Sequence, residues 1–345
     1  MEPVRLLIER LYKVQFLSTF KPVLDALDAA LFGTDRTSIE APHFVDPLDL
    51  KRYMSCVVLA LLPSALASVY FYGWQAVKII MVSYIAGGSV EVIFAIVRKK
   101  EIHEGFLVTG LIFPLTLPPT IPLWVVAVGV IFGVLFGKEV FGGTGRNVFN
   151  PALVGRLFIT VAFPSIMTLS WQLPFTDTIT SATPLVLYKT TQTLTPLPDL
   201  LLGKTAGSMG EVFRLGLILG GLFLIYTRVS DWRIPFSYLG AVLILSGIGN
   251  HFFPAKVAPA LSQMLSGGLL LGAMFMATDP VTSPFTMAGK YVSGILCGIL
   301  TVLIRGFSGY VEGVMFSIVL MNAFTPLIDH IVLTLTYRPV RERAR

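Results

Sequence analysis

The feature that most constrains this chain is a series of apolar stretches, each near the length of about 20 residues that a helix needs to cross a bilayer. The stretches cover roughly residues 53–72, 76–97, 105–119, 121–140, 151–171, 211–227, 234–253, 262–278, 290–304 and 312–330. Charged residues make up only 13% of the 345 residues, where ordinary soluble domains carry about 25%. The sequence therefore predicts an all-α polytopic membrane protein with about ten transmembrane helices.

Basic residues gather at every second boundary between these stretches. They include Lys51 and Arg52 before the first stretch, Arg98 to Lys100 after the second, Lys138 and Arg146 after the fourth, Arg228 and Arg233 after the sixth, Lys290 after the eighth, and four arginines after the tenth. Cytoplasmic loops are enriched in Lys and Arg, so the pattern predicts that both termini are cytoplasmic. The net charge of +6 is explained by this pattern and does not indicate a nucleic-acid partner.

An internal repeat relates the two halves of the chain. GLIFPLTLPPT from Gly110 and GAMFMATDPVT from Gly272 share Gly, then Phe three residues later, Thr six, Pro eight and Thr ten residues later. Each copy lies in the third stretch of its half, and five stretches per half make the two copies inverted in the membrane. Because proline ends a helix, the pattern predicts two inverted five-helix repeats with broken third helices. Gly, Thr and Pro are common in membrane helices, so chance recurrence is the alternative.

These observations divide the chain into five parts. They are a cytoplasmic N-terminal segment (1–52), a first membrane repeat (53–172), an outer, periplasmic loop (173–210), a second membrane repeat (211–331) and a basic cytoplasmic tail (332–345). The outer loop contains a polar stretch, TDTITSATPLVLYKT from Thr176, with five threonines and a serine. Its composition alone does not single out one hydroxyl.

Two sets of residues are candidates for an ion path. Glu91 lies one turn after Gly87 and Gly88 in the second stretch, and a carboxylate at membrane depth is usually functional. Helix packing at the glycines with a salt-bridged carboxylate explains the same pattern equally well. Leu271, Phe275 and Asp279 recur every four residues, which predicts a hydrophobic constriction beside a cation-attracting carboxylate.

The alternative for this second set is core packing with Asp279 as a helix-end cap. Glu312 and Asp329 bracket the last stretch and are expected only to mark its ends.

The segment from Gly137 to Arg156, GKEVFGGTGRNVFNPALVGR, is rich in glycine and lies on the inner face of the predicted topology. It lacks the Gly-Lys-Ser/Thr ending of a P-loop, and no strand precedes it as a dinucleotide fingerprint requires. Asn147 and Asn150 could pair with a planar heterocycle such as an isoalloxazine. From chemistry alone, Asn150-Pro151 is better explained as a helix N-terminus with Asn as the cap. The four histidines show no metal-ligand spacing, and no metal site is expected.

Four stretches together resemble a known family of membrane redox subunits. They are the Gly137–Arg156 segment, MATDPVTSPFT, DPLDLKRYM and VEGVMFSIVLMNAFTPLIDH, and the resemblance covers nearly the whole chain. The family comprises the NqrB component of the sodium-translocating NADH:quinone oxidoreductase and the RnfD component of the Rnf complex. The sequence motif GKEVFGGTGRN and a segment of about 50 residues before the first span are typical of the NqrB branch.

The resemblance implies cofactors and site residues at matching positions. Ser181-Ala182-Thr183 matches the motif whose threonine carries FMN through a phosphoester, which implies covalent FMN on Thr183. Asn147 and Asn150 match the asparagines near a non-covalent riboflavin. Gly87 and Gly88 match glycines associated with quinone, and Glu91, Leu271, Phe275 and Asp279 match residues of the sodium path, although the family often has phenylalanine where this chain has Leu271.

The function implied is that of a bacterial inner-membrane subunit that passes electrons from NADH through FMN and riboflavin to ubiquinone, coupled to sodium translocation. No protein side chain is expected to form bonds with substrate. The implied partners are the NqrA, NqrC, NqrD, NqrE and NqrF components of the complex, a flavin transferase for maturation, and membrane lipid. The alternatives are an RnfD-type component, which works with ferredoxin and NAD⁺, and a non-redox channel or transporter with the same repeats.

Overall fold

The computed structural model describes residues 50–99, 105–176 and 181–337. Within these ranges every regular element is helical and no strand occurs, so the all-α class is confirmed. Five helical segments are long and apolar enough to cross a membrane: Tyr53–Tyr72, Trp74–Arg98, Leu123–Phe141, Met287–Phe307 and Val314–Thr336. Three shorter apolar helices, Gly105–Leu115, Pro151–Ala162 and Arg214–Tyr226, accompany them. Residues 1–49 and 338–345 of the expected terminal segments lie outside the described residues.

The first half of the chain forms one group of helices. Its members are α3 (Leu50–Tyr72), α4 (Trp74–Arg98), α5 (Gly105–Leu115), α6 (Leu123–Gly137), α7 (Pro151–Ala162) and α8 (Pro164–Leu169), with a short 3₁₀ turn, η2 (Glu139–Phe141), after α6. Within the group α4 packs against α6, α6 packs against α7, and the short α5 lies against α3, α4 and α7. The apolar side chains of α5, such as Phe113 and Leu115, are fully buried, so α5 lies in the centre of its group.

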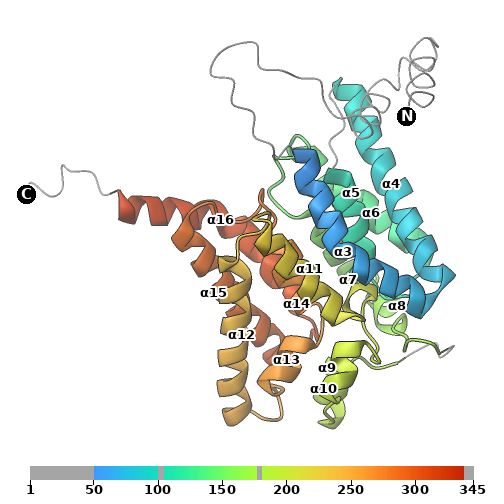
Figure 1. Ribbon diagram of the computed structural model, residues 1–345, viewed down its shortest axis with the longest axis vertical. Helices are drawn as coiled ribbons and strands as arrows, with labels where there is room; N and C mark the ends of the chain where they lie inside the picture. Colours follow the sequence, from blue (N-terminus) through green and yellow to red (C-terminus); the bar gives the residue numbers. More distant parts are fainter. Residues whose placement is uncertain (1–49, 100–104, 177–180, 338–345) are drawn as a thin grey trace, which may run out of the picture.

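The second half forms a second group with matching neighbours. Its members are α11 (Arg214–Tyr226), α12 (Arg233–Phe252), α13 (Ala260–Leu265), α14 (Leu269–Leu271), a π-helical turn η4 (Gly272–Met276), α15 (Met287–Phe307) and α16 (Val314–Thr336). Here α12 packs against α15, and α15 packs against α16. Figure 1 shows the blue-to-green helices of the first group on one side and the yellow-to-red helices of the second on the other. The two groups meet where α3 packs against α11 and α7 against α16.

Two of the expected spans are interrupted. The stretch 151–171 divides at Phe163 into α7 and α8, because Pro164 has no N–H to continue the first helix and begins a second one. The stretch 262–278 divides between α13 and α14, where Gly267 takes a positive φ of 64° that side chains with a Cβ rarely adopt. Each half therefore contains an apolar stretch that the structure divides into two helices.

The segment 173–210, expected from its composition to be a loop, contains helices of its own. These are α9 (Pro184–Thr191), α10 (Leu197–Leu202) and the start of a 3₁₀ turn, η3 (Met209–Glu211). The backbone N–H of Met209 donates to the carbonyl of Leu117, 3.0 Å away, which ties the end of this segment to the chain just after α5. The polar residues of the segment that the structure describes therefore have fixed positions against the helical groups.

Candidate functional site

One cavity of about 420 Å³ lies where α7 and α8 meet α9 and the start of α16. Its lining includes the motif residues Ser181, Ala182 and Thr183. It also includes the aromatic side chains of Trp171 and Tyr310 and the charged side chains Arg156, Glu211 and Glu312. We call it the Thr183 cavity. It combines aromatic faces, a guanidinium and a hydroxyl in one space, as small-molecule sites do.

Thr183 differs from Thr176 and Thr190, the other threonines of its stretch that the structure describes, in what its hydroxyl does. It is the residue before α9 and has an extended backbone (φ −69°, ψ 157°), but its side chain makes no capping hydrogen bond. By contrast, Thr176 donates to the carbonyl of Leu173, and Thr190 donates to that of Val186. The hydroxyl of Thr183 is thus not committed to the helix and lies on the cavity wall.

Two ionised side chains form a buried pair on the wall of the Thr183 cavity. Arg156 of α7 pairs with Glu312, 156 residues later, and the two side chains are only 4% and 18% exposed. The other carboxylate oxygen of Glu312 accepts a hydrogen bond from the N–H of Gly268 at 2.9 Å. Glu211 also approaches Gly268, because a Cβ on that glycine would lie 3.1 Å from Glu211 Oε1.

The sequence did not single out these three charged residues. Glu312 was expected only to mark a helix end, and Arg156 was noted only within its glycine-rich segment. The signal that could have found the pair is the position of Arg156 within the apolar stretch 151–171.

A second cavity, of about 80 Å³, brings together residues expected at two different sites. Asn147 and Asn150, from the segment before α7, share its wall with Phe275 of the π-helical turn and with Asp279 just after it. We call it the Asp279 cavity. Leu271 is not part of this wall. The π-helical turn changes the helical spacing between Leu271 and Phe275. Leu271 is instead 1% exposed in the core, close to Gly210.

The two asparagines of the Asp279 cavity have partly used their hydrogen-bonding capacity. Asn150 caps α7: its Oδ1 accepts from the N–H groups of Ala152 and Leu153, and Pro151 follows in the first turn. The helix-cap interpretation of Asn150-Pro151 is therefore confirmed. Asn147 donates to the carbonyl of Phe149 at 3.2 Å. Asn150 retains its side-chain N–H₂, and Asn147 retains its Oδ1, for any further partner.

Asp279 has a helix-end role in addition to its place in the cavity. Its Oδ1 accepts a hydrogen bond from the N–H of Val281 at 3.1 Å, as expected for a carboxylate that caps a turn. No ion pair of Asp279 occurs among the residues that the structure describes. The carboxylate therefore faces the cavity without a described cationic side chain in direct contact.

Glu91 is an ion-paired carboxylate. It lies on the buried stripe of α4 that also contains Gly87, and Lys138 Nζ stands 2.6 Å from its Oε1. Gly87 faces α6 so closely that a Cβ there would lie 3.0 Å from Val130, while a Cβ on Gly88 would make an ordinary van der Waals contact with Phe106. The packing role of Gly87 and the salt bridge of Glu91 are thus both present, and they restrict any further role of these residues.

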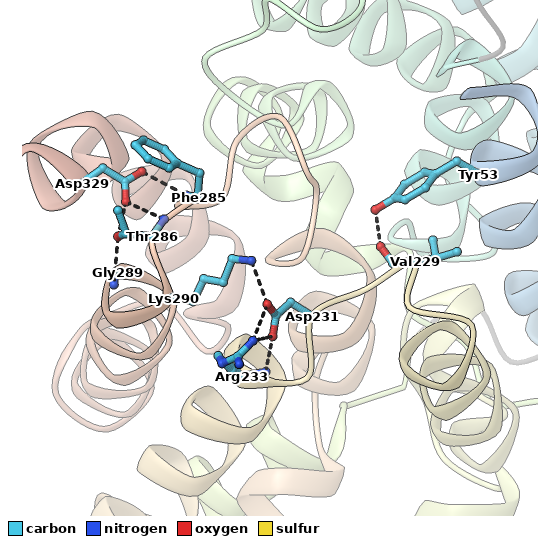
Figure 2. Close-up of polar contacts among 9 residues, drawn as sticks. All are labelled: Tyr53, Val229, Asp231, Arg233, Phe285, Thr286, Gly289, Lys290 and Asp329. Atoms are coloured by element: carbon cyan, nitrogen blue, oxygen red, sulfur yellow. Dashed lines mark hydrogen bonds and ion pairs between the residues drawn. The ribbon is translucent and has the colours of Figure 1, made fainter. Parts of the chain in front are cut away.

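At the Asp279 end of the molecule, carboxylates fix the loops that surround a polar cavity of about 690 Å³. Figure 2 shows Asp231 between Arg233 and Lys290, at 3.0 Å and 2.7 Å, and Asp329 against the backbone N–H groups of Phe285 and Thr286. Partial burial acts to raise the pKa of the Asp231 carboxyl, but hydrogen bonds from Lys290 and Arg233 outweigh it and hold that pKa below its ordinary value. Asp329 lies inside α16 and holds a loop, so it does more than mark a helix end.

Comparison with known proteins agrees with the resemblance seen in the sequence. The model of the NQR2, RnfD, RnfE family matches residues 37–338. The B subunit of the Na(+)-translocating NADH-quinone reductase of Pseudomonas paraeruginosa is 35% identical, over 90% of this chain and 91% of the relative. The B subunits of the same reductase from Azotobacter vinelandii and Yersinia pestis are 35% and 33% identical, over 89% and 95% of this chain and 90% and 95% of theirs. The chain belongs to the NQR2, RnfD, RnfE family.

Proposed function

We propose that this protein is the NqrB-type component of a sodium-translocating NADH:quinone oxidoreductase in a bacterial inner membrane, and that it carries FMN on Thr183. The observation that carries the proposal is the uncommitted hydroxyl of Thr183 on the wall of a 420 Å³ cavity. The NqrB assignment comes from relatives that match the chain along nine-tenths of its length. The other components of the complex and a flavin transferase are the partners that this assignment requires.

The Thr183 cavity fits a flavin nucleotide in volume and in chemistry. Its volume lies in the range of about 300–1,000 Å³ that small-molecule pockets have. Trp171 and Tyr310 offer faces against which a planar ring can stack, while the charge of Arg156 is already paired with Glu312. The N-terminus of α9 follows Thr183 directly, and helix N-termini favour negatively charged groups.

When attached, FMN would supply the one- and two-electron chemistry that the twenty amino acids lack. The chain presents Thr183 at the start of a helix, holds the cavity walls through the Arg156–Glu312 pair, and covers the space with aromatic side chains. A threonine hydroxyl is a weak nucleophile, and no general base is needed here if a transferase forms the phosphoester.

A riboflavin beside Asn147 and Asn150 fits the structure less well. A cavity of about 80 Å³ holds a few water molecules, since each needs roughly 10–15 Å³ on the same measure. An isoalloxazine ring does not fit in this space unless the walls move apart. The size and the single carboxylate of the Asp279 cavity favour an ion path through Phe275 and Asp279, with sodium as the cargo. The proposed quinone site at Gly87 and Gly88 would lie beside Phe106, whose ring a Cβ on Gly88 would meet in ordinary van der Waals contact.

The helix contacts support two inverted five-helix repeats. The pairs α4–α6 and α12–α15 are the second and fourth helices of their halves, and α6–α7 and α15–α16 are the fourth and fifth. The same neighbours recur in both groups, and the first helices of the two halves, α3 and α11, pack on each other. With the basic boundaries of the sequence, this arrangement favours both termini in the cytoplasm and α9 on the periplasmic side.

The proposed function is tested by looking for covalently bound flavin on the denatured protein. The chain is expressed together with a flavin transferase, and the denatured protein is run on a gel under ultraviolet light. We expect a fluorescent band for the wild type and for Thr190→Ala, whose hydroxyl donates to a helix carbonyl, and no fluorescence for Thr183→Ala. Mass spectrometry of the intact chain should show the added mass of one FMN in the wild type and no such addition in Thr183→Ala.

This experiment and an assay of the purified complex together separate the alternatives. Absence of flavin in the wild-type band would contradict the redox assignment and favour a channel or transporter. Fluorescence that survives in Thr183→Ala would place the flavin elsewhere. In the purified complex, ferredoxin-dependent reduction of NAD⁺ without quinone reduction would indicate an RnfD-type component.

A further inference from the structure

Lys138 links the two acidic residues of the expected ion path. It follows α6 directly, its backbone N–H donates to the carbonyl of Val134, and its side chain turns into the protein. The Nζ atom lies 2.6 Å from Glu91 Oε1, and the Lys138 and Glu91 side chains are only 4% and 6% exposed. The ammonium is therefore the counter-charge of a carboxylate that is almost completely removed from solvent.

The same lysine also forms part of the wall of the Asp279 cavity. Among the described residues that line this cavity, Lys138 is the only cationic side chain and Asp279 the only anionic one. Glu91 does not line the cavity. A cation in the cavity would consequently have Asp279 as its only described carboxylate, because Glu91 is already paired with the Lys138 ammonium.

Electrostatics restrict how Glu91 could receive a sodium ion. Removing one partner from a buried ion pair leaves an uncompensated charge, which is strongly unfavourable in a protein interior. As long as Glu91 stays ionised, exchange of one cation for another is therefore favoured over loss of its counter-charge. Lys138 is suited to such an exchange, because lysine carries a compact charge on a flexible four-carbon stem.

The neighbouring cation could not substitute for Lys138. Arg98 is bound to Glu139 twice, through Nη1 to Oε2 at 2.9 Å and through Nη2 to the carbonyl oxygen at 2.7 Å. Gly105 lies beside the ammonium, since a Cβ there would be 3.7 Å from Lys138 Nζ. Lys138 also lines the cavity of about 80 Å³, whose wall includes Asp279.

We propose that Lys138 is a tethered competitor of sodium: its ammonium neutralises Glu91 in this conformation and moves toward Asp279 when a sodium ion binds Glu91. The charges balance in both arrangements. In the first, the ammonium pairs with Glu91 and a sodium ion can enter at Asp279. In the second, the sodium ion pairs with Glu91 and the ammonium with Asp279. This inference rests on the proposed function, because it concerns how that complex binds its cargo.

The test uses the complete complex reconstituted in liposomes. Two quantities are measured: the sodium concentration for half-maximal stimulation of quinone reduction, and the melting temperature of the complex in sodium chloride against choline chloride. The variants are Lys138→Met, which keeps an unbranched side chain of similar shape but removes its charge, and the double variant Glu91→Gln/Lys138→Met. Arg98→Met is the control, because it breaks the adjacent, partly buried ion pair with Glu139 and leaves the Lys138–Glu91 pair intact.

For Lys138→Met we expect the half-maximal sodium concentration to fall at least about tenfold, because the competitor is gone. We also expect sodium to raise its melting temperature by several degrees more than it does in the wild type. The double variant, which has no charge at either position, should lose this extra stabilisation by sodium. Arg98→Met should keep the wild-type sodium dependence.

Three results would overturn the inference. One is a Lys138→Met complex with the wild-type half-maximal sodium concentration and no extra stabilisation by sodium. Another is a Lys138→Met complex that is unstable in both salts while the double variant is stable, since the pair would then be purely structural. The last is a double variant that keeps the extra stabilisation. A wild-type complex without any sodium stimulation would instead contradict the proposed function.

Discussion

Arg156 and Glu312 show how individual residues hold the Thr183 cavity. The pair joins α7 to the segment just before α16, and both side chains are largely shielded from solvent. A buried ion pair often stabilises the folded state no more than apolar side chains of the same volume would. Removing one partner is strongly destabilising, because the other charge stays buried and unpaired. The pair therefore fixes the relative position of two segments that are distant in sequence.

Single and double substitutions at this pair should have different costs. We expect Arg156→Met to lower the free energy of unfolding by about 3–5 kcal/mol, because Glu312 would remain buried without its counter-charge. The double variant Arg156→Met/Glu312→Gln should be less destabilised than either single variant. Denaturant unfolding in detergent, followed by tryptophan fluorescence, measures the three differences. If the destabilisation of the double variant equalled the sum of the two single variants, the two side chains would not interact.

At the scale of elements, the contact between α6 and α7 depends on glycine. A Cβ on Gly133 would lie 2.4 Å from the carbonyl oxygen of Pro151, and a Cβ on Gly155 would lie 2.6 Å from that of Gly129. The two backbones are therefore in direct contact, as in small-residue interfaces of membrane helices. This contact positions the start of α7, where Asn150 and the wall of the Asp279 cavity lie.

Alanine at Gly133 should separate the two helices. We expect a loss of about 1–3 kcal/mol in the free energy of unfolding, as for other overpacked sites. Gly240→Ala in α12 is the matched control, because a Cβ there would meet nothing within 4 Å. That substitution should be neutral or stabilising by up to about 1 kcal/mol, since alanine is the better helix former. Equal melting temperatures for both variants would contradict the close-contact interpretation.

At the scale of the whole molecule, the repeated helix neighbours predict where each loop lies. In an inverted repeat of five helices, the segment with α9 lies on the opposite side of the membrane from the loop between α11 and α12. Arg228 is exposed in that loop, and Thr193 is exposed after α9.

Cysteine labelling tests this arrangement in intact cells. In a background without Cys56 and Cys297, Thr193→Cys should react with a membrane-impermeant maleimide added from outside. Arg228→Cys should react only in inside-out vesicles. Labelling of both positions from the same side would exclude an odd number of spans between them.

Much of the fold could be predicted from local sequence because its causes are local. A run of apolar residues must leave water, and its backbone must satisfy its own hydrogen bonds, so the helices follow from composition and length. The Asn150-Pro151 cap likewise depends on neighbouring residues, and the structure confirms it. The motif at Ser181 to Thr183 could be recognised from sequence, although its FMN is still a prediction.

Only the tertiary structure determined which distant groups meet. Lys138 and Glu91 are 47 residues apart and Arg156 and Glu312 are 156 apart, so no periodicity within one helix could pair them. The π-helical turn, which no sequence period indicated, leaves Leu271 in the core and Phe275 at the cavity. The sequence by itself determined that the chain is a set of apolar helices, because each helix satisfies its own backbone. The tertiary structure decided which charges are paired and which line a cavity, because burial and pairing depend on how the helices pack.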